Sequence, residues 1–216
     1  MMDLITESYL DQTSRWPKKG RHILAQFDEK TIVVYQAYGP AIGHFAARHG
    51  YFGGEFKLNR MSWIKPNFLW MMYRSGWGVK SGQEVILAIH LQRNAFETIL
   101  ARAVHSTFIP EIYGDEQTWK GLLSASTVRL QWDPDHGPSG EKLERRAIQL
   151  GLSGDTLERY AKEWITKIED ISEFVKSQHE IINKDGYGML ITPREDIYPV
   201  ADSELSERLQ LSSGGA

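Results

Sequence analysis

The chain has 216 residues, of which 41% are hydrophobic and 25% charged, no cysteine, and a formal net charge of −3. These values describe one sizeable globular domain, exclude disulfides, thiolate metal ligands and a cysteine nucleophile, and argue against nucleic-acid binding over the whole surface. No apolar run approaches the roughly 18 residues that cross a bilayer, and the N-terminus lacks the apolar run of a signal peptide. We therefore expect a cytoplasmic protein with no membrane partner.

Residues 1–75 predict an N-terminal arm, two strands and two helices. Residues 1–20 are expected to form an arm that lies on the domain and is held by Trp16. The β-branched and aromatic runs 22–27 and 31–38 predict strands joined by a hairpin turn. The helices are predicted over 40–49 and 66–75, each with a proline at its start and a glycine just after its end.

From residue 84 onward the sequence predicts three more strands, two more helices and an edge strand. The apolar run 84–91 predicts a central, buried strand, and the capping pair Asn94 and Glu97 predicts a helix over 94–104. The further predicted elements are strands 127–132 and 146–150 with a flexible connection, a long amphipathic helix over 153–183, an edge strand with a covering loop before residue 200, and a flexible tail over 201–216.

These elements predict a single α+β domain over 21–200, with a central mixed or antiparallel sheet flanked by helices. Neither a glycine-rich dinucleotide fingerprint nor a phosphate-binding P-loop sequence is present, which disfavours both of those nucleotide-binding folds. His44 and His49 are five residues apart rather than the four that suit a metal pair on a helix, so we expect no metal site.

The segment RMSWIKPNFLWMMYRSGWG, residues 60–78, is the most unusual stretch of the sequence. It contains three tryptophans, three methionines, a phenylalanine, a tyrosine and three cations, without an acid. Rings beside cations suit a flat, anionic ligand, whereas the same rings at helical spacing are also typical of a core. Both interpretations stay open, and a mixed outcome would bury Leu69 and Met72 and turn Arg60, Lys65, Tyr73 and Arg74 toward a cleft.

Two further polar features bear on the site. Gln36 and Tyr38 share one face of the strand 31–38, which is otherwise rich in Ile and Val, so we expect that face to line a pocket. Asp133 precedes Pro134 and is expected to cap a turn.

Several stretches of the chain carry a resemblance to a known family. They are RHILAQFD, TIVVYQAY, RMSWIKPNFLWMMYRSGW, GQEVILAIH, VRLQWDP and AIQLGLSG. Over about residues 20–170 the chain resembles the domain of unknown function family 4291, which carries no settled activity. Its layout is also similar to that of the ADP-ribosyltransferase superfamily, in which a split mixed sheet holds nicotinamide adenine dinucleotide (NAD) without a Rossmann motif.

This second resemblance implies a three-part catalytic site made by Arg21 or His22, Tyr73 with Ser75, and Gln149. It also implies that a nucleotide, NAD, would be bound by residues that line the same cleft: Gln36, Tyr38, Arg60, Trp63, Lys65 and Arg74. Because a glutamine cannot act as a general base, Gln149 departs from the glutamate expected for protein acceptors, which leaves another acceptor, such as nucleic acid, or no transfer at all.

The leading hypothesis is thus a nucleotide-using transferase of the ADP-ribosyl kind. A second hypothesis is a non-catalytic module that stacks single-stranded nucleic acid on the same rings. A third is a protein-interaction domain with an exposed Trp/Met patch. The sequence leaves the acceptor and the oligomeric state open.

Overall fold

An antiparallel sheet of three strands forms one half of the computed structural model, which describes residues 3–212. Its strands, in spatial order, are β10 (Ile165–Asp170), β6 (Val85–Gln92) and β4 (Thr31–Tyr38). β6 is central and buried along nearly its whole length, as its continuous apolar run predicts. Alternate residues of β4 and β6 enter two separate apolar clusters, so both faces of this sheet are covered.

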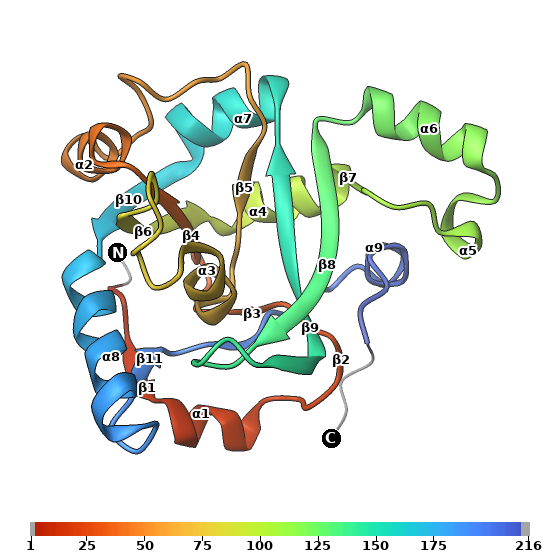
Figure 1. Cartoon of the computed structure of the whole chain (residues 1–216). Helices are drawn as coiled ribbons and strands as arrows, with labels where there is room; N and C mark the ends of the chain where they lie inside the picture. Colours follow the sequence, from red (N-terminus) through yellow and green to blue (C-terminus); the bar gives the residue numbers. More distant parts are fainter. Residues whose placement is uncertain (1–2, 213–216) are drawn as a thin grey trace.

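A second, mixed sheet is built around a long hairpin (Figure 1). Its path runs β2 (Gly20–Arg21), β9 (Lys142–Leu152), β8 (Val128–His136) and β7 (Ala103–His105), and β5 (Ser62–Ile64) also pairs with β9. Two short ladders complete the strands: β1 (Thr6–Ser8) with β11 (Ile191–Pro193), and β3 (Leu24–Ala25) with β12 (Asp196–Ile197).

The helices cover the sheets at several places. They are α1 (Tyr9–Arg15), α2 (Pro40–His49), α3 (Phe68–Ser75), α4 (Arg93–Arg102), α5 (Pro110–Tyr113), α6 (Glu116–Ala125), α7 (Gly154–Arg159), the π-helical turn η1 (Tyr160–Trp164), α8 (Ser172–Asp185) and α9 (Ser203–Arg208). α3 lies between the β4–β6–β10 sheet and the β8–β9 hairpin, whereas α5 and α6 extend away from the body (Figure 1). The predicted α+β class, with mixed and antiparallel sheets flanked by helices, is confirmed.

The predicted helix over 153–183 is wrong, because its middle is the strand β10. The chain forms α7 and η1, then turns to pair with β6 from Ile165 to Asp170, and only then begins α8. Ile165 and Ile168 have the i, i+3 spacing of a helix, and β10 accommodates this spacing through an irregularity in its register between Ile165 and Lys167. Pairing with β10 satisfies the backbone N–H and C=O groups along one edge of β6, which would otherwise lack partners. Tertiary pairing therefore overrides the local pattern.

The connection between the predicted strands 127–132 and 146–150 is shorter than predicted, because both strands extend into it. β8 continues to His136 and β9 begins at Lys142, so that only a short turn joins them. The hairpin is held from inside by Arg145, which donates to the Asp135 carboxylate; both side chains are buried. Loss of one partner of such a buried pair would be strongly destabilising, because the other charge would remain desolvated.

The helix predicted from Asn94 begins instead at Arg93, without a side-chain cap.

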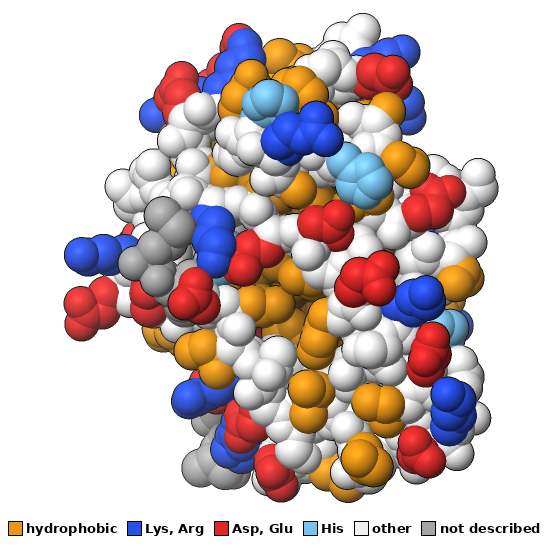
Figure 2. All heavy atoms as spheres, turned by 90° about the vertical axis from the view of Figure 1, so that its left-hand side faces the viewer, with side chains coloured by type: hydrophobic (Ala, Val, Ile, Leu, Met, Phe, Trp, Pro, Cys, Tyr) orange, Lys and Arg blue, Asp and Glu red, His pale blue; other side chains and the backbone are white. Residues whose placement is uncertain are grey.

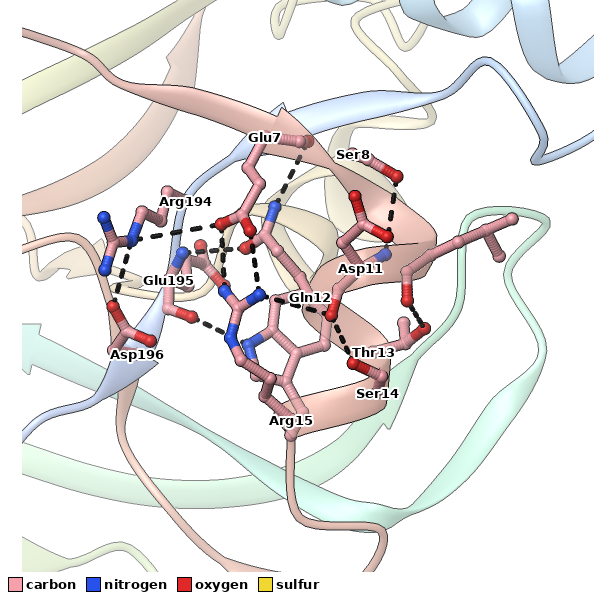
Figure 3. Close-up of polar contacts among 12 residues, drawn as sticks. Glu7, Ser8, Asp11, Gln12, Thr13, Ser14, Arg15, Arg194, Glu195 and Asp196 are labelled. Carbon is pink, nitrogen blue, oxygen red and sulfur yellow. Dashed lines mark hydrogen bonds and ion pairs between the residues drawn. The ribbon is translucent and has the colours of Figure 1, made fainter.

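The N-terminal arm is ordered and packs through buried polar contacts (Figure 3). The indole of Trp16 is buried and donates to the Glu195 carbonyl at 2.7 Å. Gln12 is fully buried, and its Oε1 accepts from the Glu195 N–H at 2.8 Å. On the solvent side, Arg15 makes a bidentate ion pair with Glu7. The arm thus fixes the position of Glu195, a residue that recurs below.

The C-terminal stretch 201–212 folds into α9 and packs against the domain. Asp202 caps the helix by accepting from the Leu205 N–H, and Leu209 is completely buried. The Trp132 indole donates to the Leu209 carbonyl at 2.9 Å. The remainder of the predicted tail, residues 213–216, lies outside the described residues.

The surface that carries α2, β10 and α8 has acidic and basic side chains interspersed, with hydrophobic side chains showing between them (Figure 2). Such a face lacks the single-sign field that attracts polyanions. No helix within residues 3–212 is long and apolar enough to cross a membrane.

Candidate functional site

The two main sheets meet at Lys65, directly after β5. The Tyr35 N–H donates to the Lys65 carbonyl at 2.7 Å, and the Lys65 N–H donates back to the Tyr35 carbonyl at 3.3 Å. One residue earlier, β5 is paired with β9 of the other sheet. The backbone of Lys65 is therefore held to β4, while the residue before it is paired with β9, so Lys65 lies where the two sheets meet.

A cleft of about 440 Å³ opens at this joint. We name it the Lys65 cleft. It is lined by Trp63, Lys65, Trp70, Tyr73, Arg74, Gln131, Asp133 and Gln149. These residues come from β5, from α3 and from the β8–β9 hairpin, so three elements far apart in sequence build the cleft.

Lys65 is a buried cation, only 5% exposed. Within residues 3–212, no carboxylate lies within 4.0 Å of its amine. Burial and, to a smaller extent, the Arg74 guanidinium lower the pKa of Lys65 to about 8, against the opposing effect of the Asp133 charge. An amine that is desolvated and has no paired acid is an unusual and costly arrangement.

Asp133 provides the negative charge of the cleft, and two glutamines hold it. Gln131 Nε2 donates to Asp133 Oδ1 at 2.9 Å, and Gln149 Nε2 donates to Asp133 Oδ2 at 2.7 Å. Gln131 and Gln149 are direct cross-strand partners in the β8–β9 register, and Asp133 lies two residues further along the same face. The prediction that Asp133 caps a turn is wrong, because it lies within β8.

The third wall is α3, whose start is fixed by a buried cap. Asn67 accepts from the Trp70 N–H at 2.7 Å. The Glu195 carboxylate accepts from Asn67 Nδ2 at 3.0 Å and from the Phe68 N–H at 2.6 Å. Burial raises the pKa of Glu195 well above its usual range, and the Phe68 hydrogen bond opposes that shift. The N-terminal arm thus positions α3, and through it the rings of the cleft.

Some side chains of α3 lie in the core and others line the cleft. The core interpretation therefore applies to part of the helix and the cleft interpretation to another part. Leu69 and Met72 are buried, while Tyr73 is 40% exposed at the cleft. The Tyr73 ring stacks on His136 with centroids 3.5 Å apart and planes 9° apart, and Trp70 lies nearly parallel to both. The His136 imidazole thus covers one face of the Tyr73 ring, and Lys80 Nζ lies over the ring, 5.9 Å from its centroid.

Trp63 completes the aromatic lining because Gly151 leaves room for it. Trp63 and Gly151 are cross-strand partners. A Cβ on Gly151 would lie 2.9 Å from the Trp63 ring and 2.7 Å from the Met61 sulfur. The glycine therefore lets the indole lie flat against β9, beside Gln149.

The structure brings five of the predicted site residues together in the cleft: Trp63, Lys65, Tyr73, Arg74 and Gln149. It places Arg60 and Tyr38 at a neighbouring cavity of about 410 Å³. Gln36 is buried behind that cavity, where its amide donates to the Tyr38 hydroxyl and to Ser62, and its carbonyl accepts from Tyr160. The polar face of β4 is thus mostly occupied by internal hydrogen bonds.

Arg21 does not line the Lys65 cleft. It pairs with Arg146, an odd number of residues from Gln149, so its side chain lies on the opposite face of the sheet. On that face lies His105, whose pKa is lowered to about 4. The main cause is the burial of His105 itself, and the charge of Arg21 contributes. Its Nε has no hydrogen-bond partner among residues 3–212.

Sequence reasoning missed Gln131, Asp133 and Trp70 as lining residues. The signal for two of them was present. Arg129, Gln131 and Asp133 alternate with apolar residues along β8, which is the period of a strand with one polar face. Trp70 gave no such signal, because its 5% exposure depends on the stack with His136.

The cleft is therefore lined by both charges and by aromatic rings. Lys65 and Arg74 provide positive charge and hydrogen-bond donors. Asp133 and its two glutamines provide negative charge and hydrogen-bond acceptors. Within the described part of the chain, no group of three His, Asp or Glu side chains could hold a metal ion.

A family model described as a domain of unknown function (DUF4291) matches residues 22–198. That range contains the whole of the Lys65 cleft. No curated protein matches the chain.

Proposed function

We propose a function for this chain, which belongs to the family described as a domain of unknown function (DUF4291): it binds a nucleotide in the Lys65 cleft and uses it in a transferase reaction of the ADP-ribosyl kind. The observation that carries the proposal is the buried Lys65 amine, which has no acid partner within 4.0 Å among residues 3–212 and lines a cleft that also contains aromatic rings. A ligand phosphate would neutralise this charge and recover part of the cost of its burial.

The other lining residues match the remaining parts of a nucleotide. The exposed face of Tyr73 and the indole of Trp63 would stack on a base or on nicotinamide. Arg74, at the end of α3, would form a forked contact to phosphate. Asp133 and the side-chain carbonyl of Gln149 would accept hydrogen bonds from ribose hydroxyls. NAD carries all of these groups, and the residues present fit it.

The reaction would break the bond between the ribose and nicotinamide. Positive charge develops on the ribose as nicotinamide leaves, and a carboxylate aimed at that carbon stabilises the charge. Asp133 is the acid that the cleft offers for this role. Gln149 would act by orienting Asp133, since an amide takes no proton at neutral pH. A nucleic acid is the acceptor we propose, because the cations Lys57 and Arg60 outnumber the one acid, Glu55, among the residues that line the second cavity.

The test is a titration of NAD against the intrinsic tryptophan fluorescence of three proteins: wild type, Arg74→Ala and Arg60→Ala. Both arginines are exposed, so neither substitution threatens the fold, but only Arg74 lines the Lys65 cleft. The proposal predicts saturable quenching in the wild type and in Arg60→Ala, and at least about tenfold weaker binding in Arg74→Ala, as expected for loss of one charged contact. Release of nicotinamide would then be measured by chromatography.

A flat titration in the folded wild type would overturn the nucleotide proposal. Equal weakening in both variants would move the binding site away from the Lys65 cleft. Single-stranded oligonucleotides form the comparison arm: binding that falls steeply with salt, in the absence of NAD binding, would favour the non-catalytic nucleic-acid module.

A further inference from the structure

Lys65 has a property that phosphate binding does not use. Its amine lines an open cleft, yet the surrounding protein removes water from it and supplies no acid within 4.0 Å among the described residues. Its neighbour Arg74 is a second cation. Burial and a neighbouring cation are the two means by which proteins keep a lysine neutral and therefore nucleophilic.

We propose that Lys65 is a nucleophilic amine that forms an imine with a flat, anionic aldehyde held in the Lys65 cleft. Arg74 would bind the anionic group, and Tyr73 and Trp63 would stack on the plane of the molecule. This proposal does not rest on the nucleotide function, because it concerns the reactivity of the amine itself.

The step balances without any oxidant or reductant. The lone pair of the neutral amine attacks the carbonyl carbon, and a carbon–nitrogen bond forms while the carbonyl π bond breaks. The nitrogen loses its two protons and the carbonyl oxygen gains two, the carbon–oxygen bond breaks, and the oxygen leaves as water, so that a neutral C=N bond remains. Asp133, the acid among the residues that line the cleft, is placed to exchange protons with this oxygen.

Other lysines of the chain give an internal comparison. Lys57 and Lys80 are exposed to water, and Lys167 is paired with Asp3 and Glu169. Burial, with a contribution from Arg74, lowers the pKa of Lys65 to about 8 from 10.5, which raises the neutral fraction near neutral pH by roughly two- to threehundredfold. A weaker base is also a somewhat weaker nucleophile, so we expect Lys65 to react at least about tenfold faster than an exposed lysine.

The experiment uses the intact wild-type protein and pyridoxal 5′-phosphate as the probe, a flat aldehyde with a phosphate. The protein is incubated with limiting probe at pH 7.5, the imine is reduced with borohydride, and labelled lysines are identified by peptide mass mapping. Pyridoxal, which lacks the phosphate, is the matched probe. Arg74→Ala is the matched variant, with its fold checked by circular dichroism, and Arg60→Ala serves as its control.

The proposal predicts that Lys65 is labelled first, at least about tenfold ahead of Lys57 and Lys80. It also predicts that pyridoxal labels Lys65 at least about fivefold more slowly, and that Arg74→Ala abolishes this preference for the phosphate without changing the labelling of Lys57. Labelling of Lys65 no faster than that of the exposed lysines in the wild type would overturn the proposal. So would equal labelling of Lys65 by the two probes. Because the readout is a modified lysine, a negative NAD titration leaves this result independent.

Discussion

At the residue scale, the most important group of the cleft is Lys65, whose burial in the charged form destabilises the folded protein. The chain fixes Lys65 through backbone hydrogen bonds to Tyr35, and burial then disfavours its charged form. A side chain that served only packing would be apolar at this position. Proteins retain such destabilising groups where function needs them, and stability and activity then trade against each other.

Replacement of this lysine by methionine should therefore stabilise the protein near neutral pH. The folded pKa of Lys65, about 8, lies below the ordinary 10.5, so the charged form costs stability below pH 8 and the cost disappears as the pH rises toward 10.5. Lys65→Met should raise the free energy of unfolding at pH 7 by up to about 3 kcal/mol, and by much less at pH 10. Urea unfolding at both pH values measures the difference.

Lys57→Met is the matched control, because Lys57 is exposed and should change stability by less than about 0.5 kcal/mol at either pH. A loss of stability in Lys65→Met at pH 7, with the control unchanged, would mean that the amine has a stabilising partner and would contradict this account.

At the element scale, the cleft is positioned by how β5, α3 and the β8–β9 hairpin are fastened. The N-terminal arm fixes Glu195, Glu195 caps α3, and α3 presents Tyr73 and Arg74. Pro66 and Gly76 made α3 recognisable from sequence, whereas the alternation in β8 was a signal for its polar face that the prediction did not use. The dependence of α3 on Glu195 was not predictable, because their hydrogen bond joins residues 127 positions apart.

The packing of Trp63 against Gly151 gives a prediction at this scale. Gly151→Ala would put a Cβ 2.9 Å from the Trp63 ring, so the indole must move or the strands must separate. We expect a loss of about 1–3 kcal/mol of stability, as for overpacked sites, together with a changed tryptophan emission spectrum. Thermal unfolding and fluorescence of the same sample measure both effects.

Gly121→Ala provides the control. Gly121 lies within α6 and nothing lies within 4 Å of its added Cβ, so the better helix propensity of alanine should stabilise by up to about 1 kcal/mol. Unchanged stability and emission in Gly151→Ala would show that Trp63 does not lie against β9.

At the scale of the whole molecule, the site lies where two separate sheets are connected by the short bridge between Tyr35 and Lys65. The strand runs 31–38 and 84–91 and the α+β class could be predicted, because each depends on local patterns. The joint at Lys65 could not, since it depends on β5 pairing with β9 while Lys65 pairs with Tyr35. The same non-local pairing turned the middle of the predicted helix 153–183 into β10.

This division also explains which site residues were foreseen. Tyr73, Arg74, Lys65 and Trp63 belong to one continuous segment, so its composition indicated them together. Arg21 lies on a separate strand, and the register of β2 against β9 turns it to the other face of the sheet. Sequence composition identifies a segment, whereas sheet register determines which distant residues face it.

Both proposals rest on a lysine amine that is desolvated at the joint of the sheets. The most direct test is to measure its pKa by heteronuclear NMR on protein labelled in the lysine side chains, with the Lys65 resonance assigned as the one that disappears in Lys65→Met. This account predicts a titration midpoint of about 8, well apart from the other lysines. A midpoint near 10.5 would mean that Lys65 is solvated like an exposed lysine, and would contradict the account.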